Sequence, residues 1–275
     1  MPPERLGSTE LFERTWLFVA HANQLPRSGD FVTQYMGEDP TLVVRDGSQR
    51  LRVFLNRCRH RGAVLCPFER GSARLFTCSF HGWMYGLDGA LMSLQERGTQ
   101  PVPVASDRWN LVEVPRVAAC GRFIFANWNV EAEPLDDFLG ALREPLASEL
   151  GCADSRGLQP TPLRQRVIIE CSWESDRPVL EADEEHPLTV LASFPGLRLL
   201  ASPGMAASIA IEQWHPRGSG AVESWLQVLL DPAAPEPLRR ASTQFWLRLH
   251  ARAGTVNGDD SDYGRDYRFV TDRVL

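Results

Sequence analysis

The chain has 275 residues, 43% of them hydrophobic and 23% charged, which is ordinary for a folded globular protein and excludes a disordered or fibrous one. Lys and Arg number 29 against 35 Asp and Glu, and the resulting net charge of −6 argues against a nucleic-acid-binding protein. No apolar run approaches the roughly 18 residues that span a bilayer, and the run at 16–20 is too short for a signal peptide. We therefore expect a cytoplasmic protein that binds neither nucleic acid nor membrane.

In chain order, the pattern of polar and apolar residues predicts a short helix within 8–20 and then a series of strands. The first strands are expected at 30–35, 41–45, 51–55 and 75–77, and later ones at 121–128, 164–171, 207–214 and 222–230. Helices are expected from 134 onward and over 235–253. Residues 21–117 are thus predicted to form a small all-β domain, whereas 118–275 mix sheet and helix.

Two of the predicted strands lead directly into pairs of cysteine and histidine. Cys58 and His60 form a C-x-H motif, Cys78 and His81 form a C-x-x-H motif, and 17 residues separate the two motifs. Together they offer two thiolates and two imidazoles, which fits either a tetrahedral zinc site or a Rieske [2Fe–2S] cluster. In a Rieske centre one iron takes both cysteines and the other takes both histidines. The other cysteines are expected to be small buried apolar residues: Cys66, Cys120, Cys152 and Cys171.

Residues 58–62, Cys-Arg-His-Arg-Gly, and 78–85, Cys-Ser-Phe-His-Gly-Trp-Met-Tyr, resemble the cluster motif of the ring-hydroxylating Rieske non-haem iron oxygenases. The resemblance extends over nearly the whole chain, with an apparent internal deletion. It implies that the four motif residues bind the cluster, and that Trp83 and Tyr85 shield it and keep its surroundings apolar.

The resemblance also implies an α+β fold in three parts. Residues 1–20 would form an N-terminal helix belonging to the catalytic part, and 21–117 the all-β Rieske [2Fe–2S] domain. Residues 118–275 would form a truncated helix-grip (START-like) catalytic domain, with an antiparallel sheet and a C-terminal helix.

In this family a second site holds a mononuclear iron through two histidines and one carboxylate. By resemblance, His186 matches the first histidine ligand, Asp260 the carboxylate, and Asp183 the acid that carries electrons between subunits. The second histidine is absent, because Leu191 and Ala192 stand where it would fall. A bound Fe(II) is therefore expected to be weakly held or absent. Alternatively, the acids at 181–186 form a solvated helix face.

The function implied by the resemblance is that of an oxygenase large subunit. A reductase, often with a ferredoxin, would pass electrons from NAD(P)H to the [2Fe–2S] cluster, so that O₂ is activated to hydroxylate a small aromatic substrate, as in aromatic hydrocarbon catabolism. The family predicts a homotrimer, or a hetero-oligomer with a small beta subunit or an intact large subunit. Two alternatives are a catalytically defective subunit kept for electron transfer or assembly, and another Rieske carrier. His21, His215 and His250 are expected to be structural.

Overall fold

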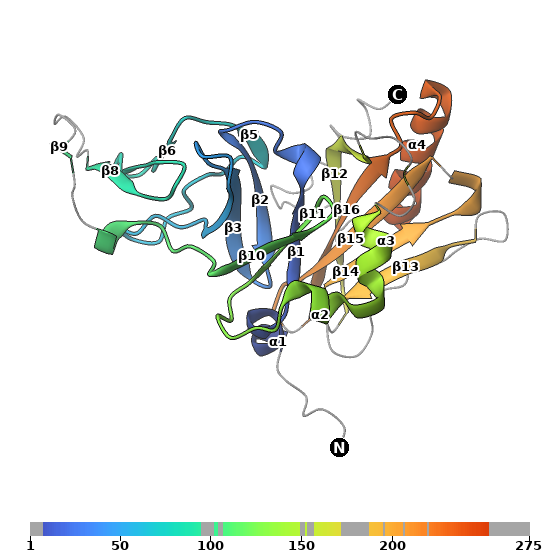
Figure 1. Cartoon of the computed structure of the whole chain (residues 1–275), viewed down its shortest axis with the longest axis horizontal. Helices are drawn as coiled ribbons and strands as arrows, with labels where there is room; N and C mark the ends of the chain where they lie inside the picture. Colours follow the sequence, from blue (N-terminus) through green and yellow to red (C-terminus); the bar gives the residue numbers. More distant parts are fainter. Residues whose placement is uncertain are drawn as a thin grey trace, which may run out of the picture. The chain divides into compact units, whose positions relative to one another are not determined.

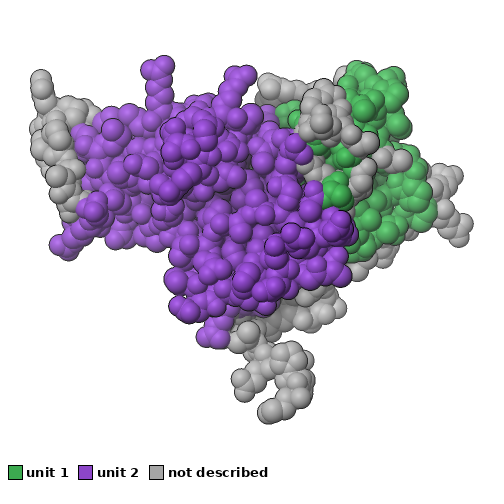
Figure 2. Space-filling view, in the orientation of Figure 1, with its two compact units in different colours: residues 1–9, 148–275 green, residues 10–147 purple. Residues whose placement is uncertain are grey.

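The computed structural model describes residues 8–94, 102–103, 107–148, 152, 157–171, 187–194, 196–205, 207–218 and 220–252. The chain folds into two compact units (Figure 2). Unit 2 is residues 10–147, and unit 1 is residues 1–9 with 148–275. The described part therefore combines antiparallel sheets with few helices, which confirms the predicted α+β class. No helix in it is long and apolar enough to cross a membrane.

The predicted helix within 8–20 ends earlier than expected. Helix α1 runs over Ser8–Arg14, and the chain then extends into strand β1, Leu17–His21, whose residues are all buried. The continuous burial of β1 explains the error, because a strand buried on both faces is as apolar as a buried helix and shows no alternation.

The described residues of unit 2 form three antiparallel sheets. Their strand orders are β1-β11-β10, β4-β3-β2-β5 and β6-β7-β8-β9. The further strands are β2 Asp30–Met36, β3 Asp39–Arg45, β4 Leu51–Leu55, β5 Arg70–Ser72, β6 Phe76–Thr77, β7 Met84–Tyr85, β8 Leu91–Leu94, β9 Val102–Pro103, β10 Arg116–Cys120 and β11 Phe123–Asn127. The short 3₁₀ helices η1 Ala22–Gln24 and η2 Asp107–Trp109 lie in connections between strands.

The helix predicted from residue 134 onward is broken in the structure. Helix α2, Leu135–Leu139, is followed by the 3₁₀ turn η3, Gly140–Leu142, and by α3, Arg143–Ala147. Gly140 has φ +51°, a positive value that glycine adopts without steric cost and that ends the α-helix here.

The described residues of unit 1 form one five-stranded antiparallel sheet of order β12-β16-β15-β14-β13, with helix α4, Glu236–Arg252, packed on β12, β15 and β16 (Figure 1). The strands are β12 Gln159–Ile169, β13 Thr189–Phe194, β14 Leu197–Ala201, β15 Ser208–Pro216 and β16 Val222–Leu230, and the 3₁₀ turn η5 covers Pro203–Met205. Leu226 and Val228 of β16 pack in one cluster with Trp246 and Leu249 of α4. Burying this apolar helix face against the sheet holds α4 in place.

The sequence predicts three parts with separate roles, residues 1–20, 21–117 and 118–275. This division by role stays a prediction. The compact units divide elsewhere, because 118–147 pack in unit 2 with the strands that precede them.

Candidate metal centre

The two Cys/His motifs form loops with the same backbone turn. The Cys58 carbonyl accepts a hydrogen bond from the Gly62 N–H at 2.9 Å, and the Cys78 carbonyl accepts one from the Gly82 N–H, also at 2.9 Å. The two glycines have φ +74° and +73°, a left-handed conformation that glycine adopts without steric cost. The glycine in each motif therefore closes the turn that carries one cysteine and one histidine.

Both loops are anchored in the core of unit 2. The first follows β4, and the second lies between β6 and β7. Cys58 and Cys78 are each 2% exposed and belong to the same hydrophobic cluster, whereas His60 and His81 are half-buried. The sulfurs thus lie inside and the imidazoles nearer the surface.

The four side chains are arranged in two pairs. The imidazole rings of His60 and His81 have centroids 4.6 Å apart. Burial raises the pKa of the Cys58 thiol, and the adjacent Cys78 thiol raises it further, while a hydrogen bond with Tyr85 opposes the change. Sulfur beside sulfur and imidazole beside imidazole is the donor arrangement of a cluster with one Cys₂ iron and one His₂ iron.

This pairing speaks against the zinc alternative. A structural zinc ion needs four ligands that converge on one point. Among the residues that the structure describes, no three His, Cys, Asp or Glu side chains are placed to hold a single metal ion. All four motif residues are described, and Cys58 and Cys78 are free thiols. The donor set therefore fits a binuclear cluster better than one zinc ion.

Tyr85 ties the first loop to the second. Its hydroxyl accepts a hydrogen bond from the Arg59 backbone N–H at 3.1 Å and lies 3.4 Å from the Cys58 sulfur. Burial raises the pKa of the phenol, and a Cys58 sulfur that has lost its proton to bind metal can only accept a hydrogen bond from this hydroxyl. Sequence reasoning assigned Tyr85 a shielding role, and the structure adds this hydrogen bond.

Trp83 stacks directly on one predicted ligand. Its ring lies parallel to that of His60, with an interplanar angle of 9° and a centroid separation of 4.8 Å. Trp109 packs edge-on against Trp83 at 5.5 Å and 87°. Sequence reasoning missed Trp109, because it lies 26 positions beyond Trp83 and belongs to no motif.

A buried asparagine fixes the approach to the first loop, and sequence reasoning missed it as well. Asn56 accepts from the Cys66 N–H at 2.9 Å and donates to the Cys66 carbonyl at 2.7 Å. Cys66 and Cys120 are buried as predicted, whereas Cys152 and Cys171 are only half-buried, so the expectation was wrong for these two.

The residues predicted for the mononuclear iron, Asp183, His186 and Asp260, lie outside the described residues. Leu191 and Ala192, at the expected place of the second histidine, belong to strand β13. His21, His215 and His250 are all buried, as expected of structural residues, and their structural role stays a prediction.

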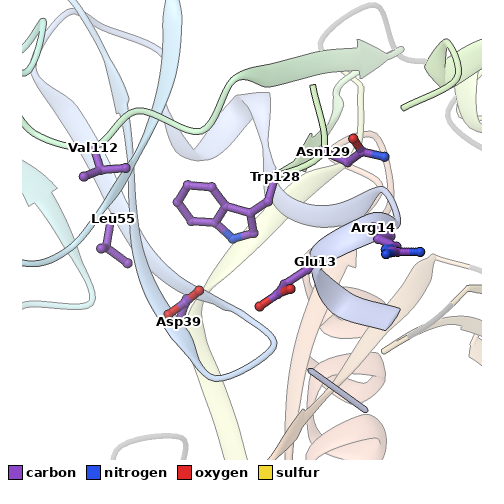
Figure 3. Close-up of a pocket in the computed structure, with 7 residues that line it drawn as sticks. All are labelled: Glu13, Arg14, Asp39, Leu55, Val112, Trp128 and Asn129. Atoms are coloured by element: carbon purple, nitrogen blue, oxygen red, sulfur yellow. The ribbon is translucent and has the colours of Figure 1, made fainter. Parts of the chain in front are cut away.

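A cavity of about 600 Å³ also opens in unit 2 (Figure 3). None of the four motif residues lines it, so it is separate from the candidate metal centre. Its lining residues are Glu13, Arg14, Asp39, Leu55, Val112, Trp128 and Asn129.

Comparison with known proteins agrees with this donor arrangement. Residues 15–106 match the model of the Rieske [2Fe–2S] domain. The chain is 34% identical to the biphenyl dioxygenase subunit alpha of Paraburkholderia xenovorans, and the match covers 92% of this chain and 74% of that protein. The chain belongs to the alpha-subunit family of ring-hydroxylating Rieske dioxygenases.

Other members of the family are similar over most of the chain. The biphenyl 2,3-dioxygenase subunit alpha of Rhodococcus jostii is 29% identical, over 92% of this chain and 72% of that one. The naphthalene 1,2-dioxygenase of Rhodococcus sp., crystallised with indole, has the same fold, with a TM-score of 0.72 at 23% identity, over 96% of this chain and 78% of the other.

The same alignments confirm the internal deletion. The match to the Paraburkholderia protein runs over 340 positions, although this chain has only 275 residues. The relative therefore holds residues inside the aligned stretch that have no counterpart here.

Proposed function

We propose that Cys58, His60, Cys78 and His81 hold a Rieske [2Fe–2S] cluster, and that the chain is the large subunit of an oxygenase system that hydroxylates a small aromatic substrate. The pairing of two buried sulfurs and two adjacent imidazoles carries this proposal. Membership in a family whose named relatives are dioxygenase alpha subunits for biphenyl and benzene supports it.

When bound, a Rieske cluster accepts and passes on single electrons, at a higher potential than an all-cysteine cluster. The chain's own residues set the conditions for this chemistry. The core residues around Cys58 and Cys78 keep water from the sulfurs, and Tyr85 donates a hydrogen bond to one of them. Trp83 covers one face of the His60 imidazole and fixes its orientation. Binding requires both thiols to lose their protons.

The partners are proposed from the family. A reductase, with or without a ferredoxin, would supply electrons from NAD(P)H. The subunits would assemble as a trimer or a hetero-oligomer, in which Asp183 accepts a hydrogen bond from His81 or His60 of the next subunit. Asp183→Asn tests this bridge: cluster reduction should stay normal, while onward electron transfer within the assembly falls sharply. Unchanged transfer, or a protein that remains a monomer, would exclude the bridge.

The cluster assignment is tested directly by spectroscopy. The purified protein should be red-brown, and its reduced form should give a Rieske-type electron paramagnetic resonance signal. Cys58→Ser and His81→Ala should abolish the signal, whereas Cys66→Ser, which changes a buried cysteine outside the donor set, should keep it. A colourless protein with one zinc per chain would show the assignment to be wrong.

A further inference from the structure

A row of packed aromatic rings leads from one predicted cluster ligand toward the surface of unit 2. His60 lies parallel to Trp83 at 4.8 Å, and Trp83 meets Trp109 edge-on at 5.5 Å. The Arg108 guanidinium carbon lies 5.1 Å from the centre of the Trp109 ring. Both tryptophans are half-buried and Arg108 is exposed, so the row connects an imidazole of the candidate centre with solvent.

The outer end of this row is held in place by hydrogen bonds of the Asn110 side chain and of the backbone. Trp109 ends the 3₁₀ turn η2, and the next residue, Asn110, accepts from the Leu91 N–H at 2.9 Å and donates to Asp107 at 3.2 Å. The Leu111 N–H donates to the Gly89 carbonyl at 2.9 Å. The turn that carries Trp109 is thus fixed to the hairpin that follows the second ligand loop.

The residues around the inner end carry positive charge. Arg57, Arg59 and Arg61 are exposed on the first ligand loop, and residues 57–62 contain no acid. Arg108 adds a further positive charge at the outer end, beside the exposed Asp107. Because the whole chain has a net charge of −6, this basic region is local rather than a property of the protein's whole surface. A partner steered to it by charge would be acidic.

We propose that Trp109 and Arg108 form the docking site of an acidic one-electron carrier protein, and that Trp83 and His60 lie on the path of its electron. This inference rests on the proposed function. In the step, the reduced carrier loses one electron and the oxidised cluster gains it, and no bond forms or breaks. Rings in van der Waals contact shorten the gap that the electron must tunnel through.

The second ligand loop offers a less direct path. Phe80 is 63% exposed, but its ring lies 6.4 Å from that of His81 at an interplanar angle of 36°, without the parallel stacking seen at His60. Electron uptake through His60 also leaves His81 available for the proposed bridge to the next subunit.

The test uses the cluster-loaded protein and a purified acidic [2Fe–2S] ferredoxin as the carrier. Stopped-flow absorbance gives the rate constant for reduction by the reduced ferredoxin, and calorimetry gives the Kd of the oxidised ferredoxin. Photoreduced 5-deazaflavin, which needs no docking site, reports on the cluster alone.

The variants are Arg108→Glu, Trp109→Leu and Trp109→Phe. Arg50→Glu is the matched control, because Arg50 is exposed just before β4, at the opposite end of that strand from the Cys58 loop.

At low ionic strength, Arg108→Glu should slow reduction by ferredoxin about tenfold, and added salt should reduce the difference from the unchanged protein. Trp109→Leu should raise the ferredoxin Kd about tenfold, and Trp109→Phe should restore much of the affinity. Reduction by deazaflavin should not change in Arg108→Glu, and Arg50→Glu should behave as the unchanged protein does.

The docking proposal would be overturned if Arg108→Glu and Arg50→Glu had equal effects, or if Phe80→Ser rather than the Trp109 variants weakened ferredoxin binding. If Trp109→Leu disturbed the cluster itself, reduction by deazaflavin would change too. The docking site would then be tested by Arg108→Glu alone. Failure of the proposed function looks different, because the Rieske signal would then be absent from the unchanged protein.

Discussion

The hydroxyl of Ser224 lies 2.9 Å from Nε2 of His250, and this contact joins β16 to α4 in the core of unit 1. The other ring nitrogen of His250 lies 3.1 Å from the side-chain oxygen of Gln165 on β12. Ser224 also donates to Glu212, whose carboxylate pairs with Arg198 at 2.9 Å. All five side chains are buried, so one polar chain fastens the helix to the sheet where apolar packing would leave its orientation less defined.

The burial of His250 makes the stability of unit 1 depend on pH. Burial lowers the pKa of His250 to about 3, from 6.5 in the unfolded chain. Between these values the unfolded chain binds a proton that the folded one does not, so stability is lost as the pH falls below about 6.5. For one such histidine, the loss in the free energy of unfolding at pH 4.5 is about 2–3 kcal/mol.

Urea denaturation at pH 7 and pH 4.5 measures this dependence. His250→Gln removes the titrating group but keeps hydrogen-bonding ability, so the variant should lose about 2–3 kcal/mol less than the unchanged protein between the two pH values. His21→Gln in unit 2 serves as a comparison, because burial, assisted by Arg122, lowers the pKa of His21 to about 3 as well. Parallel pH profiles for His250→Gln and the unchanged protein would contradict the prediction.

Gly62 permits a test of the turn that carries the first pair of ligands. Its φ of +74° strains any residue with a Cβ, although a Cβ there would meet no other atom within 4 Å. The cost of substitution should therefore come from the backbone alone. Gly62→Asn should be tolerated better than Gly62→Val, because Asn adopts left-handed conformations more readily than a β-branched residue.

We expect Gly62→Val to lower the free energy of unfolding by about 1–3 kcal/mol and to reduce the cluster content. Gly62→Asn should retain most of both. Thermal unfolding and the intensity of the paramagnetic resonance signal per chain measure the two effects. Equal losses in the two variants would show that space rather than backbone conformation limits the position.

The chemistry of the candidate centre could be predicted from the sequence, because its four donors lie in two short motifs that follow predicted strands. The contacts around it could not, since the edge-on packing of Trp109 against Trp83 depends on how η2 returns to the hairpin after β7. The same holds for Gln165 and His250, which are 85 positions apart and meet only through the order of strands in the sheet. Local patterns also misplaced the ends of helices. They could not show that strand β1 follows α1 within the range 8–20, or that Gly140 divides the helix at 135–147.

Tyr85 should raise the reduction potential of a cluster held in unit 2. Its hydroxyl donates toward the Cys58 sulfur at 3.4 Å, and a hydrogen bond to a ligand sulfur stabilises the reduced, more negative state. Tyr85→Phe removes the hydroxyl and keeps the buried ring. Loss of a hydrogen bond of about 1 kcal/mol should lower the reduction potential of the cluster in Tyr85→Phe by roughly 40–50 mV, because the cluster takes up one electron.

Redox titration followed by circular dichroism measures this potential. Tyr35→Phe is the matched control, because Tyr35 is a tyrosine of β2 in the same unit that lies outside the hydrophobic cluster around Cys58 and Cys78. An unchanged potential in Tyr85→Phe would show that the hydroxyl serves only the Arg59 backbone.

The iron content separates an intact oxygenase subunit from a defective one. The family site needs two histidines and a carboxylate, but Leu191 and Ala192 lie in β13 at the expected place of the second histidine. A single histidine and a single carboxylate would hold Fe(II) weakly. We therefore expect about two irons per chain after purification, which is the number in a [2Fe–2S] cluster alone. Metal analysis should give the same number after mild chelation, and His186→Ala should not change it. Three irons per chain, falling to two in His186→Ala, would show that a further ligand completes the site and that the chain is catalytically intact.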